Sequence, residues 1–598
     1  MTEFSAIVMA FYFEYCCRRN CPTPELDRAR CRSAPAAGAH RIASMLQLQM
    51  LQVASTIGAV PPNIVFVLTD DEDTMLGGDS ALAMPRGLPA LSRRGATASN
   101  WFVSTPVCAV SRAEILTGRF YHNLKDTPQH GDPWDRRGNT FGPCFAARPG
   151  GGCGGRSSAP GRNMHLNFTH LSPGPTVFQH LASAGYTVGV FGKYLNRIPM
   201  RTDGTPQIPT GVSEWFVSPG DEANKATELD SSGEYYPEFY YHNNGTWNNT
   251  AREYETNFLG NRSVAWMRKA AASAAPFFMY LAPHSPHGMA LPAPRYATLT
   301  INATSPRTPS WNYSAPDHHW LISQQKPLAV GEAKTLDTHF QKRWRCLRAT
   351  DDLLAELDAE LERLNLWGST YLFFTSDHGY HFGELRLGGG KWNVYDHDVR
   401  VPMRIVGPRI TAGSMLGLVG SHVDLAPTWL ALAGISATPE EMDGRSLASA
   451  LQQRAPEETV KTEETVQGSD DVLSFLPVGS AYLEYHGLGP TGASSAPWFR
   501  QQDALNNTYR ALRVIDRRQG GLGNVLFSEF GTFDFTTINS REFFEMDSDP
   551  WQMHNVYSSL SNQEQMEWAQ RVASLYTCSG ASCRMAQKSL LILKKTTT

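Results

Sequence analysis

Residues 63–69 read Asn-Ile-Val-Phe-Val-Leu-Thr and are followed directly by Asp70-Asp71-Glu72-Asp73. A short apolar run of this kind, bounded by polar residues, is typical of a strand that is buried on both faces of a parallel sheet. Four further runs have the same character, at 186–191, 276–281, 370–375 and 401–406. The sequence therefore predicts buried strands of one large, mostly parallel sheet.

Helical patterns lie between these runs. The clearest covers 349–365, where five leucines keep one apolar face and charged residues fill the other. Strands that alternate with helices predict an α/β sandwich. Later β-like pieces at 481–485, 508–514 and 524–528, followed by 541–557, predict a smaller C-terminal α+β domain.

Composition excludes several classes of protein. The net charge is −4 with no basic block, so nucleic acid is not expected as the main partner. No run of 18 apolar residues exists to span a bilayer. Ten cysteines in 598 residues are too few for a disulfide-dense scaffold. These features predict a globular protein without a membrane span.

Polar side chains follow two of the predicted strands. Asp70 and Asp71 follow the first, and Asp377 and His378 follow the run at 370–375. The carboxyl ends of parallel strands meet at one edge of a sheet, and adjacent carboxylates repel one another unless a cation neutralises them. Three carboxylates and one imidazole suit Ca²⁺ or Mg²⁺ better than zinc. The alternative for either segment alone is a solvated acidic turn.

Residues 105–119 contain a cysteine just before an expected helix, in the order Cys108-Ala-Val-Ser111-Arg112-Ala-Glu-Ile-Leu-Thr117-Gly118-Arg119. A helix N-terminus and a nearby Arg112 favour the thiolate form of Cys108. A buried structural cysteine is the alternative.

The pattern Cys-x-x-Ser-Arg-x-x-x-Leu-Thr-Gly-Arg resembles the signature of the sulfatase family. The resemblance extends from about 62 to 584 and is strongest to N-acetylglucosamine-6-sulfatases and the related heparan endosulfatases. The matching stretches include Phe-Gly-Lys193, Ala-Pro-His284-Ser-Pro286, Ser-Asp377-His378-Gly, Lys391 with Tyr395-Asp-His-Asp398, and Cys578-Ser-Gly-x-x-Cys583. The resemblance implies an alkaline-phosphatase-like fold and a sulfuric ester hydrolase.

The resemblance also implies a role for each matching residue. Cys108 would be converted to formylglycine by the formylglycine-generating enzyme, and its hydrated aldehyde would be the nucleophile. One Ca²⁺ per chain would be bound by Asp70, Asp71, Cys108 as formylglycine, Asp377 and His378. The other catalytic residues would be Arg112 on the aldehyde hydrate, Lys193 and Lys391 on the sulfate, and His284 as the acid for the leaving alcohol.

Three positions depart from the family pattern or leave a choice. Val110 stands where the family usually has Pro or Ala, at a position that the modifying enzyme reads. His378 stands where many sulfatases have Asn. His287 lies three residues after His284 and is the alternative acid.

The expected activity is hydrolysis of a sulfate ester, such as a 6-O-sulfated N-acetylglucosamine unit. Heparan endosulfatases carry a long basic insertion that this chain lacks, so an exo-acting or small-substrate enzyme is favoured. The alternatives are an arylsulfatase, a phosphoester hydrolase of the same fold, and a catalytically silent protein that binds sulfated glycans.

Two sequence features favour the secretory pathway, with a lysosome-like or extracellular destination. The chain has seven N-x-[ST] sequons, at Asn167, Asn244, Asn248, Asn261, Asn302, Asn312 and Asn506. The pairs Cys578/Cys583 and Cys144/Cys153 could close small disulfide loops or stay as free thiols. We expect a targeting or disordered segment at 1–60, a catalytic domain at 61–451, an acidic linker at 452–471 and a C-terminal α+β subdomain at 472–598.

Overall fold

The computed structural model describes residues 61–124, 175–219, 235–452, 478–486 and 507–590, apart from positions 197, 202, 289, 436, 519 and 533. The predicted N-terminal segment, almost all of the acidic linker at 452–471, and Cys144 with Cys153 lie outside these residues. The four-part division of the chain therefore stays a prediction.

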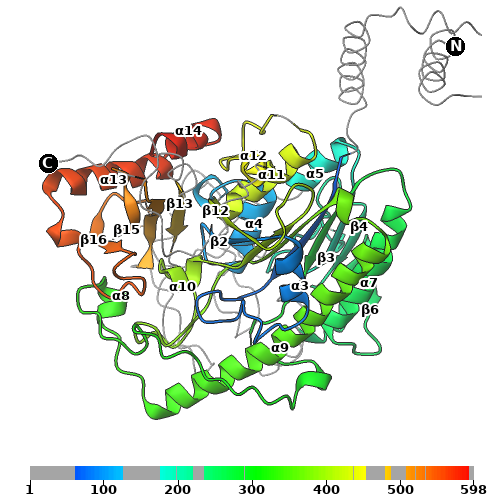
Figure 1. The fold of residues 1–598 in the computed structure, drawn as a ribbon, viewed down its shortest axis with the longest axis horizontal. Coiled ribbons are helices and arrows are strands. Elements are labelled where there is room, and N and C mark those ends of the chain that lie inside the picture. Colours follow the sequence, from blue (N-terminus) through cyan, green and yellow to red (C-terminus); the bar gives the residue numbers. More distant parts are fainter. Residues whose placement is uncertain are drawn as a thin grey trace, which may run out of the picture. The chain divides into compact units, whose positions relative to one another are not determined.

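A ten-stranded sheet forms the centre of the protein (Figure 1). Its order is β12-β2-β11-β8-β1-β7-β3-β4-β5-β6, and only the pairs that involve β11 or β5 are antiparallel. The strands are β1 (Asn63–Thr69), β2 (Ala96–Phe102), β3 (Thr187–Gly192), β4 (Glu214–Val217), β5 (Phe239–His242), β6 (Gly245–Asn248), β7 (Phe277–Ala282), β8 (Thr370–Ser376), β11 (Met403–Val406) and β12 (Ser414–Ser421). The predicted large, mostly parallel sheet is confirmed.

Helices cover both faces of this sheet. They are α3 (Gly87–Arg94), α4 (Cys108–Thr117), α5 (Val177–Ser183), α7 (Glu255–Ala271), α9 (Val330–Arg363), α11 (Leu425–Leu432) and α12 (Ala448–Gln452). Shorter elements are α8 (Trp320–Ser323), α10 (Asp396–Val399) and the paired strands β9 (His381–Phe382) and β10 (Gly389–Gly390).

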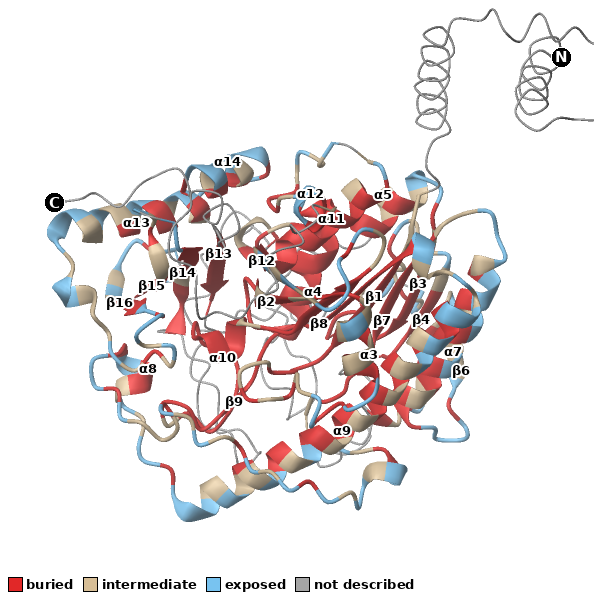
Figure 2. Ribbon diagram, in the orientation of Figure 1, coloured by how far each residue is buried: buried red, intermediate tan, exposed pale blue. Residues whose placement is uncertain are grey.

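The central strand β1 contributes to a separate hydrophobic core on each face. Ile64, Phe66 and Leu68 pack with residues of α4, α5 and α11. Val65 and Val67 point the other way and pack with residues of α3, α7 and α9. Side chains alternate between the two faces of a strand, so a wholly apolar run is what a strand between two layers of helices requires. Figure 2 shows β1 and its neighbours β7 and β8 as buried, while the exposed residues lie mainly on the outer faces of the helices and in the connecting loops.

The helix predicted at 349–365 is longer than its leucine pattern indicated. Helix α9 begins at Val330 and has 34 residues. Its first half buries Leu336, His339, Phe340, Arg343 and Trp344, so polar and aromatic side chains largely take the place of a row of leucines. Because Arg343 is one of these buried residues, apolar periodicity alone could not identify this half of the helix.

The C-terminal part forms a second sheet, as predicted. Strands β13 (Val478–Tyr485), β14 (Tyr509–Asp516), β15 (Gly523–Gly531) and β16 (Ile538–Glu545) pair in sequence order and are all antiparallel. Helices α13 (Asn562–Tyr576) and α14 (Ala581–Leu590) follow, and a disulfide joins Cys578, which follows α13, to Cys583 of α14. Of the two possibilities for Cys578 and Cys583, the structure has the disulfide.

Within the described residues, no helix is both long enough and apolar enough to cross a membrane.

Trp429 of α11 offers a test of the core on one face of the sheet. It is fully buried, and its ring contacts Phe66, Phe278 and Phe373 on three adjacent strands, at centroid distances of 4.8, 5.2 and 6.0 Å. Trp429→Ala should lower the free energy of unfolding by about 3–5 kcal/mol, measured by chemical denaturation, because it leaves a cavity between helix and sheet. Trp320→Ala is the matched control, since Trp320 is 40% exposed, and should cost less than about 1 kcal/mol. Equal losses would contradict this account of the core.

Candidate active site at the carboxyl edge of the sheet

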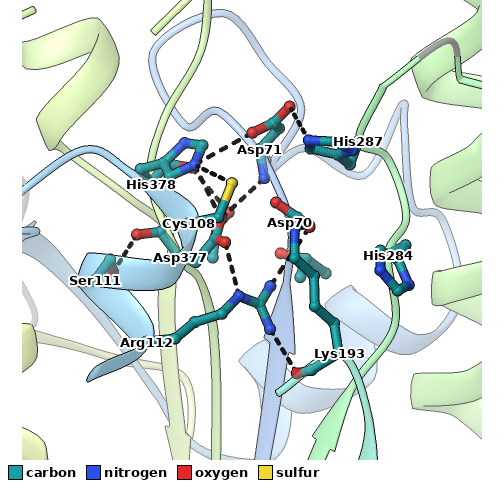
Figure 3. A network of polar contacts seen from close by, with 12 residues as sticks. Asp70, Asp71, Cys108, Ser111, Arg112, Lys193, His284, His287, Asp377 and His378 are labelled. Atoms are coloured by element: carbon teal, nitrogen blue, oxygen red, sulfur yellow. Dashed lines mark hydrogen bonds and ion pairs between the residues drawn. The ribbon is translucent and has the colours of Figure 1, made fainter. Parts of the chain in front are cut away.

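Four adjacent strands of the sheet, β8, β1, β7 and β3, end at the same edge (Figure 3). Their register is matched there: Thr69 lies opposite Ser376, and Gly192 lies opposite Ala282. The residues that follow these strand ends are Asp70 and Asp71, Asp377 and His378, Lys193, and His284. All are buried, with at most 4% of the residue surface exposed. The structure therefore brings together residues that are up to 308 positions apart in the chain.

Cys108 faces this edge from the first residue of α4. The residue before it, Val107, is extended, and the helix ends at Gly118, whose φ of 65° is in the left-handed region that favours glycine. The Cys108 Sγ atom lies 2.9 Å from Lys391 Nζ and 3.3 Å from His378 Nε2. Burial and the Asp70 carboxylate raise the pKa of the thiol, but Lys193 and Lys391 outweigh them and hold that pKa well below its usual range.

The carboxylates form a tight cluster beside Cys108. Possible ligand atoms of Asp70, Asp71, Cys108 and His378 all lie within 4.8 Å of one another. Asp377 is outside that group of four, but its Oδ1 lies 3.5 Å from His378 Nε2 and accepts a hydrogen bond of 3.0 Å from the Asp71 backbone N–H. Asp71 has a φ of 69°, a strained conformation for a residue with a side chain.

Three cationic side chains surround the carboxylates. Lys391 Nζ lies 2.6 Å from Asp71 Oδ1, and Lys193 Nζ bonds Asp70 Oδ2. Arg112 lies one turn along α4 from Cys108 and donates from Nε to Asp377 Oδ2 at 3.0 Å and from Nη1 to the Lys193 carbonyl at 2.8 Å. The contacts of Arg112 thus join the acidic residues to the end of β3.

The cluster has the properties of a site for a hard cation. Burial and the nearby Asp70 carboxylate raise the pKa of Asp377 to about 6, which reflects repulsion between the two acids. Among the described residues, Asp70 Oδ1 is buried and has no hydrogen-bond partner. A divalent cation bound by Asp70, Asp71, Asp377 and His378 would favour the ionised form of Asp377 and give Asp70 Oδ1 a partner.

His284 is held by a residue that the sequence did not single out. Glu255, the first residue of α7, is fully buried and accepts from the His284 backbone N–H at 2.9 Å, and its Oε1 lies 2.8 Å from the His284 ring Nδ1. His287 lies nearby, with its Nε2 4.0 Å from Asp71 Oδ2. Figure 3 shows both histidines on the same side of the cluster. The bond to Nδ1 leaves Nε2 of His284 for a substrate.

Two other residues at the site were not assigned a role from the sequence. His422 Nδ1 lies 2.9 Å from Ser111 Oγ, which donates to the Asp377 carbonyl, and burial with nearby His378 lowers the pKa of His422 to about 3. Arg343 of α9 donates to the carbonyl of Pro286 at 3.1 Å and also to the Asp71 carbonyl. Arg343 therefore links the His284 loop to the acidic loop after β1.

Comparison with known proteins gives a consistent result. The sequence profile of the sulfatase family matches residues 62–435. N-acetylglucosamine-6-sulfatase of Homo sapiens is 29% identical over 545 residues, which cover 88% of this chain and 86% of the relative. The extracellular sulfatase SULF-1 homolog of Drosophila melanogaster is 31% identical over 66% of this chain and 31% of its own length. A solved structure in complex with its substrate D-glucosamine-2-N,6-O-disulfate superposes with a TM-score of 0.60 at 18% identity, covering 88% of this chain and 98% of that chain.

Proposed function

The chain belongs to the sulfatase family and is a sulfuric ester hydrolase, and on that premise we propose that it removes sulfate from a 6-O-sulfated N-acetylglucosamine unit, with a formylglycine nucleophile and one Ca²⁺. The expected family and the alkaline-phosphatase-like fold are confirmed. The observation that carries the proposal is the position of Cys108. Its Sγ lies at the start of a buried helix, 2.9 Å from the Lys391 ammonium and within 4.8 Å of ligand atoms of Asp70, Asp71 and His378.

The nucleophile in this proposal is residue 108 after oxidation. As formylglycine it would supply a hydrated aldehyde oxygen that attacks sulfur as the S–O bond to the leaving alcohol breaks. The second hydroxyl of the sulfated hemiacetal would then lose its proton and re-form the aldehyde as sulfate departs, a release for which a thiol has no equivalent. Every residue of α4 is buried, including Val110. The modifying enzyme must therefore act on this segment before the chain folds, and the effect of Val110 falls on that step and not on the folded site.

The cationic residues have distinct roles in this proposal. Lys193 pairs with Asp70 and Lys391 with Asp71, and from there they would stabilise the negative charge that gathers on the sulfate oxygens in the transition state. Arg112 would hold Asp377 and the oxygen substituents of residue 108 in place. Ca²⁺ bound by Asp70, Asp71, residue 108, Asp377 and His378 would supply Lewis-acid polarisation of the sulfate.

We assign protonation of the leaving alcohol to His284. Glu255 bonds its Nδ1, which fixes the ring and leaves Nε2 to donate. His287 is the alternative, but its Nε2 is 4.0 Å from the Asp71 carboxylate, which belongs to the metal cluster. The same assignment gives Glu255 a role as a positioning residue.

Separate observations support the proposed substrate and compartment. The N-acetylglucosamine-6-sulfatase match over 88% of the chain favours a 6-O-sulfated amino sugar, and a net charge of −4 favours a small or terminal unit over a long polyanion. The Cys578–Cys583 disulfide and the exposed sequon residues Asn244, Asn248, Asn261 and Asn302 favour a secretory, lysosome-like or extracellular route.

Residue 108 provides the direct test of the proposal. Protein made in a secretory host should contain formylglycine at this position in at least part of the molecules, as read by mass spectrometry of the 108 peptide. That preparation should release sulfate from 6-O-sulfated N-acetylglucosamine faster than from other sulfated monosaccharides or an aryl sulfate, and Cys108→Ala should release none. Cysteine in every molecule, together with no sulfate release, would favour the silent glycan-binding alternative.

Ca²⁺ binding should depend on pH through Asp377. Added Ca²⁺ should raise the Tm of the wild type, because it binds only the folded state. The rise should be larger at about pH 7 than at about pH 5, since a proton on Asp377, with its pKa raised to about 6, competes with the cation and lowers affinity about tenfold one pH unit below that pKa. Asp377→Asn should lose most of the rise, while the exposed control Asp534→Asn keeps it. An equal rise in both variants would rule out Asp377 as a ligand.

The roles of Glu255, His284 and His287 can be distinguished by comparing kcat on substrates with different leaving groups. Glu255→Gln and His284→Ala should each lower kcat by about 10²-fold on a sugar sulfate, whose alcohol needs a proton to depart. The loss should be much smaller on an aryl sulfate, because a phenolate departs more readily unprotonated. His287→Ala should affect both substrates equally. A leaving-group effect in His287→Ala instead would make His287 the acid.

A further inference from the structure

A buried carboxylate contacts the loop that carries Lys391. It has not been given a role in the proposed reaction above. Asp398 of α10 is fully buried. Its Oδ1 lies 2.7 Å from His381 Nδ1 and 2.9 Å from His397 Nδ1. Its Oδ2 accepts from the Asn393 backbone N–H at 2.9 Å and from Asn393 Nδ2 at 3.1 Å. One carboxylate thus binds four nitrogen atoms from three separate residues.

These bonds lead to the residues beside Cys108. Asn393 Nδ2 also contacts the carbonyl oxygen of Lys391, at 3.3 Å. On the other side, the backbone carbonyl of Asp398 accepts from the Gly379 N–H at 2.8 Å, next to His378. A Cβ at Gly379 would lie 2.2 Å from the His397 carbonyl, so the two segments are in closest contact. Asp398 therefore connects the Lys391 loop to the segment that follows β8.

An ionised carboxylate is the side chain that this arrangement requires. Burial raises the pKa of Asp398, but His381 and His397 outweigh it and hold the pKa well below its usual range. An asparagine in the same place would keep one acceptor oxygen and turn an NH₂ group toward the other donors. Two of the four bonds would then be lost or reversed.

We propose that Asp398 is a positioning residue for the sulfatase reaction: through Asn393 it fixes the backbone of Lys391 so that the ammonium stays beside residue 108. The proposal rests on the proposed function, in which Lys391 contacts the sulfate. Lys391 is 5% exposed and its Nζ lies 2.9 Å from Cys108 Sγ, so a small shift of its backbone would move the charge away from a sulfate bound at residue 108. A misplacement of about 1 Å in a catalytic group can cost about 10²-fold in rate.

The same three side chains could also be considered as a metal site, since ligand atoms of His381, His397 and Asp398 lie within 4.8 Å of one another. The separations of 2.7 and 2.9 Å are those of N–H to carboxylate hydrogen bonds. Both contacts are satisfied if each ring carries its proton on Nδ1. The observed geometry therefore favours the hydrogen-bonded arrangement over a bound metal.

The test compares Asp398→Asn with the wild type, using a sugar sulfate that the wild type hydrolyses. We expect kcat to fall by about 10- to 100-fold with KM within about threefold, because Lys391 acts on the transition state more than on bound substrate. In a Lys391→Ala background, Asp398→Asn should cause no further fall in kcat, since there is no ammonium left to position. Asn393→Ala, which keeps the carboxylate but removes the link to Lys391, should show the same pattern and serves if Asp398→Asn does not fold.

Asp443→Asn is the matched control. Asp443 is also fully buried and accepts from the Phe120 N–H and from Asn123 Nδ2, both at 2.8 Å, but it joins the end of α4 to the disulfide turn. This variant should lower Tm without changing kcat in the fraction that remains folded.

Several results would overturn the proposal. One is an unchanged kcat in both Asp398→Asn and Asn393→Ala. Another is a further fall of similar size in the Lys391→Ala background, which would mean that Asp398 acts by general destabilisation. A third is a stoichiometric transition metal in the wild type that Asp398→Asn loses. Absence of sulfate release by the wild type would instead contradict the proposed function itself.

Discussion

The carboxylates of Asp70, Asp71 and Asp377 are buried close together and repel one another. Cationic side chains from several surrounding elements neutralise their negative charge. Lys193 pairs with Asp70 and Lys391 with Asp71, and Arg112 pairs with both Asp377 and Asp70. These cations hold the pKa values of Asp70 and Asp71 below their usual range, whereas burial and the Asp70 carboxylate still raise the pKa of Asp377. The charge that a sulfate ester develops in its transition state is of the sign that such a cationic environment stabilises. The same groups therefore serve the fold and the proposed chemistry.

The cationic side chains neutralise the carboxylates only while both stay in position. Residues from distant parts of the chain hold the loops that carry them. Glu255 of α7 holds His284, and Arg343 of α9 links the His284 loop to Asp71. Asp398 holds the Lys391 loop. Buried groups with all their bonds satisfied are rigid, which suits residues whose positions must be kept within a fraction of an ångström.

The C-terminal sheet contributes to this support although it adds no residue to the cluster itself. Arg513 of β14 pairs with Asp396 of α10 at 2.9 Å, and Gln552 accepts from the Asp396 N–H at 2.9 Å. Asn507 donates to the carbonyl of Trp392, next to Lys391, at 3.1 Å. The loop between β10 and α10 is thus held from the active-site side by Asp398 and from the other side by the second sheet. These bonds connect the smaller sheet to the loop that carries Lys391.

Local patterns in the sequence were sufficient for the strands and for part of the site. The run at 63–69 is strand β1 residue for residue, because a strand between two helical layers must be apolar on both faces. Asp70, Asp71, Asp377 and His378 were identified because they follow strands whose ends had to meet, and Cys108, Lys193, His284 and Lys391 because they match a family pattern. The first half of α9, with its buried Arg343, and the roles of Glu255 and Asp398 were decided only by the tertiary structure. These side chains act through contacts with residues up to 272 positions away, and no spacing along one strand or helix records such a contact.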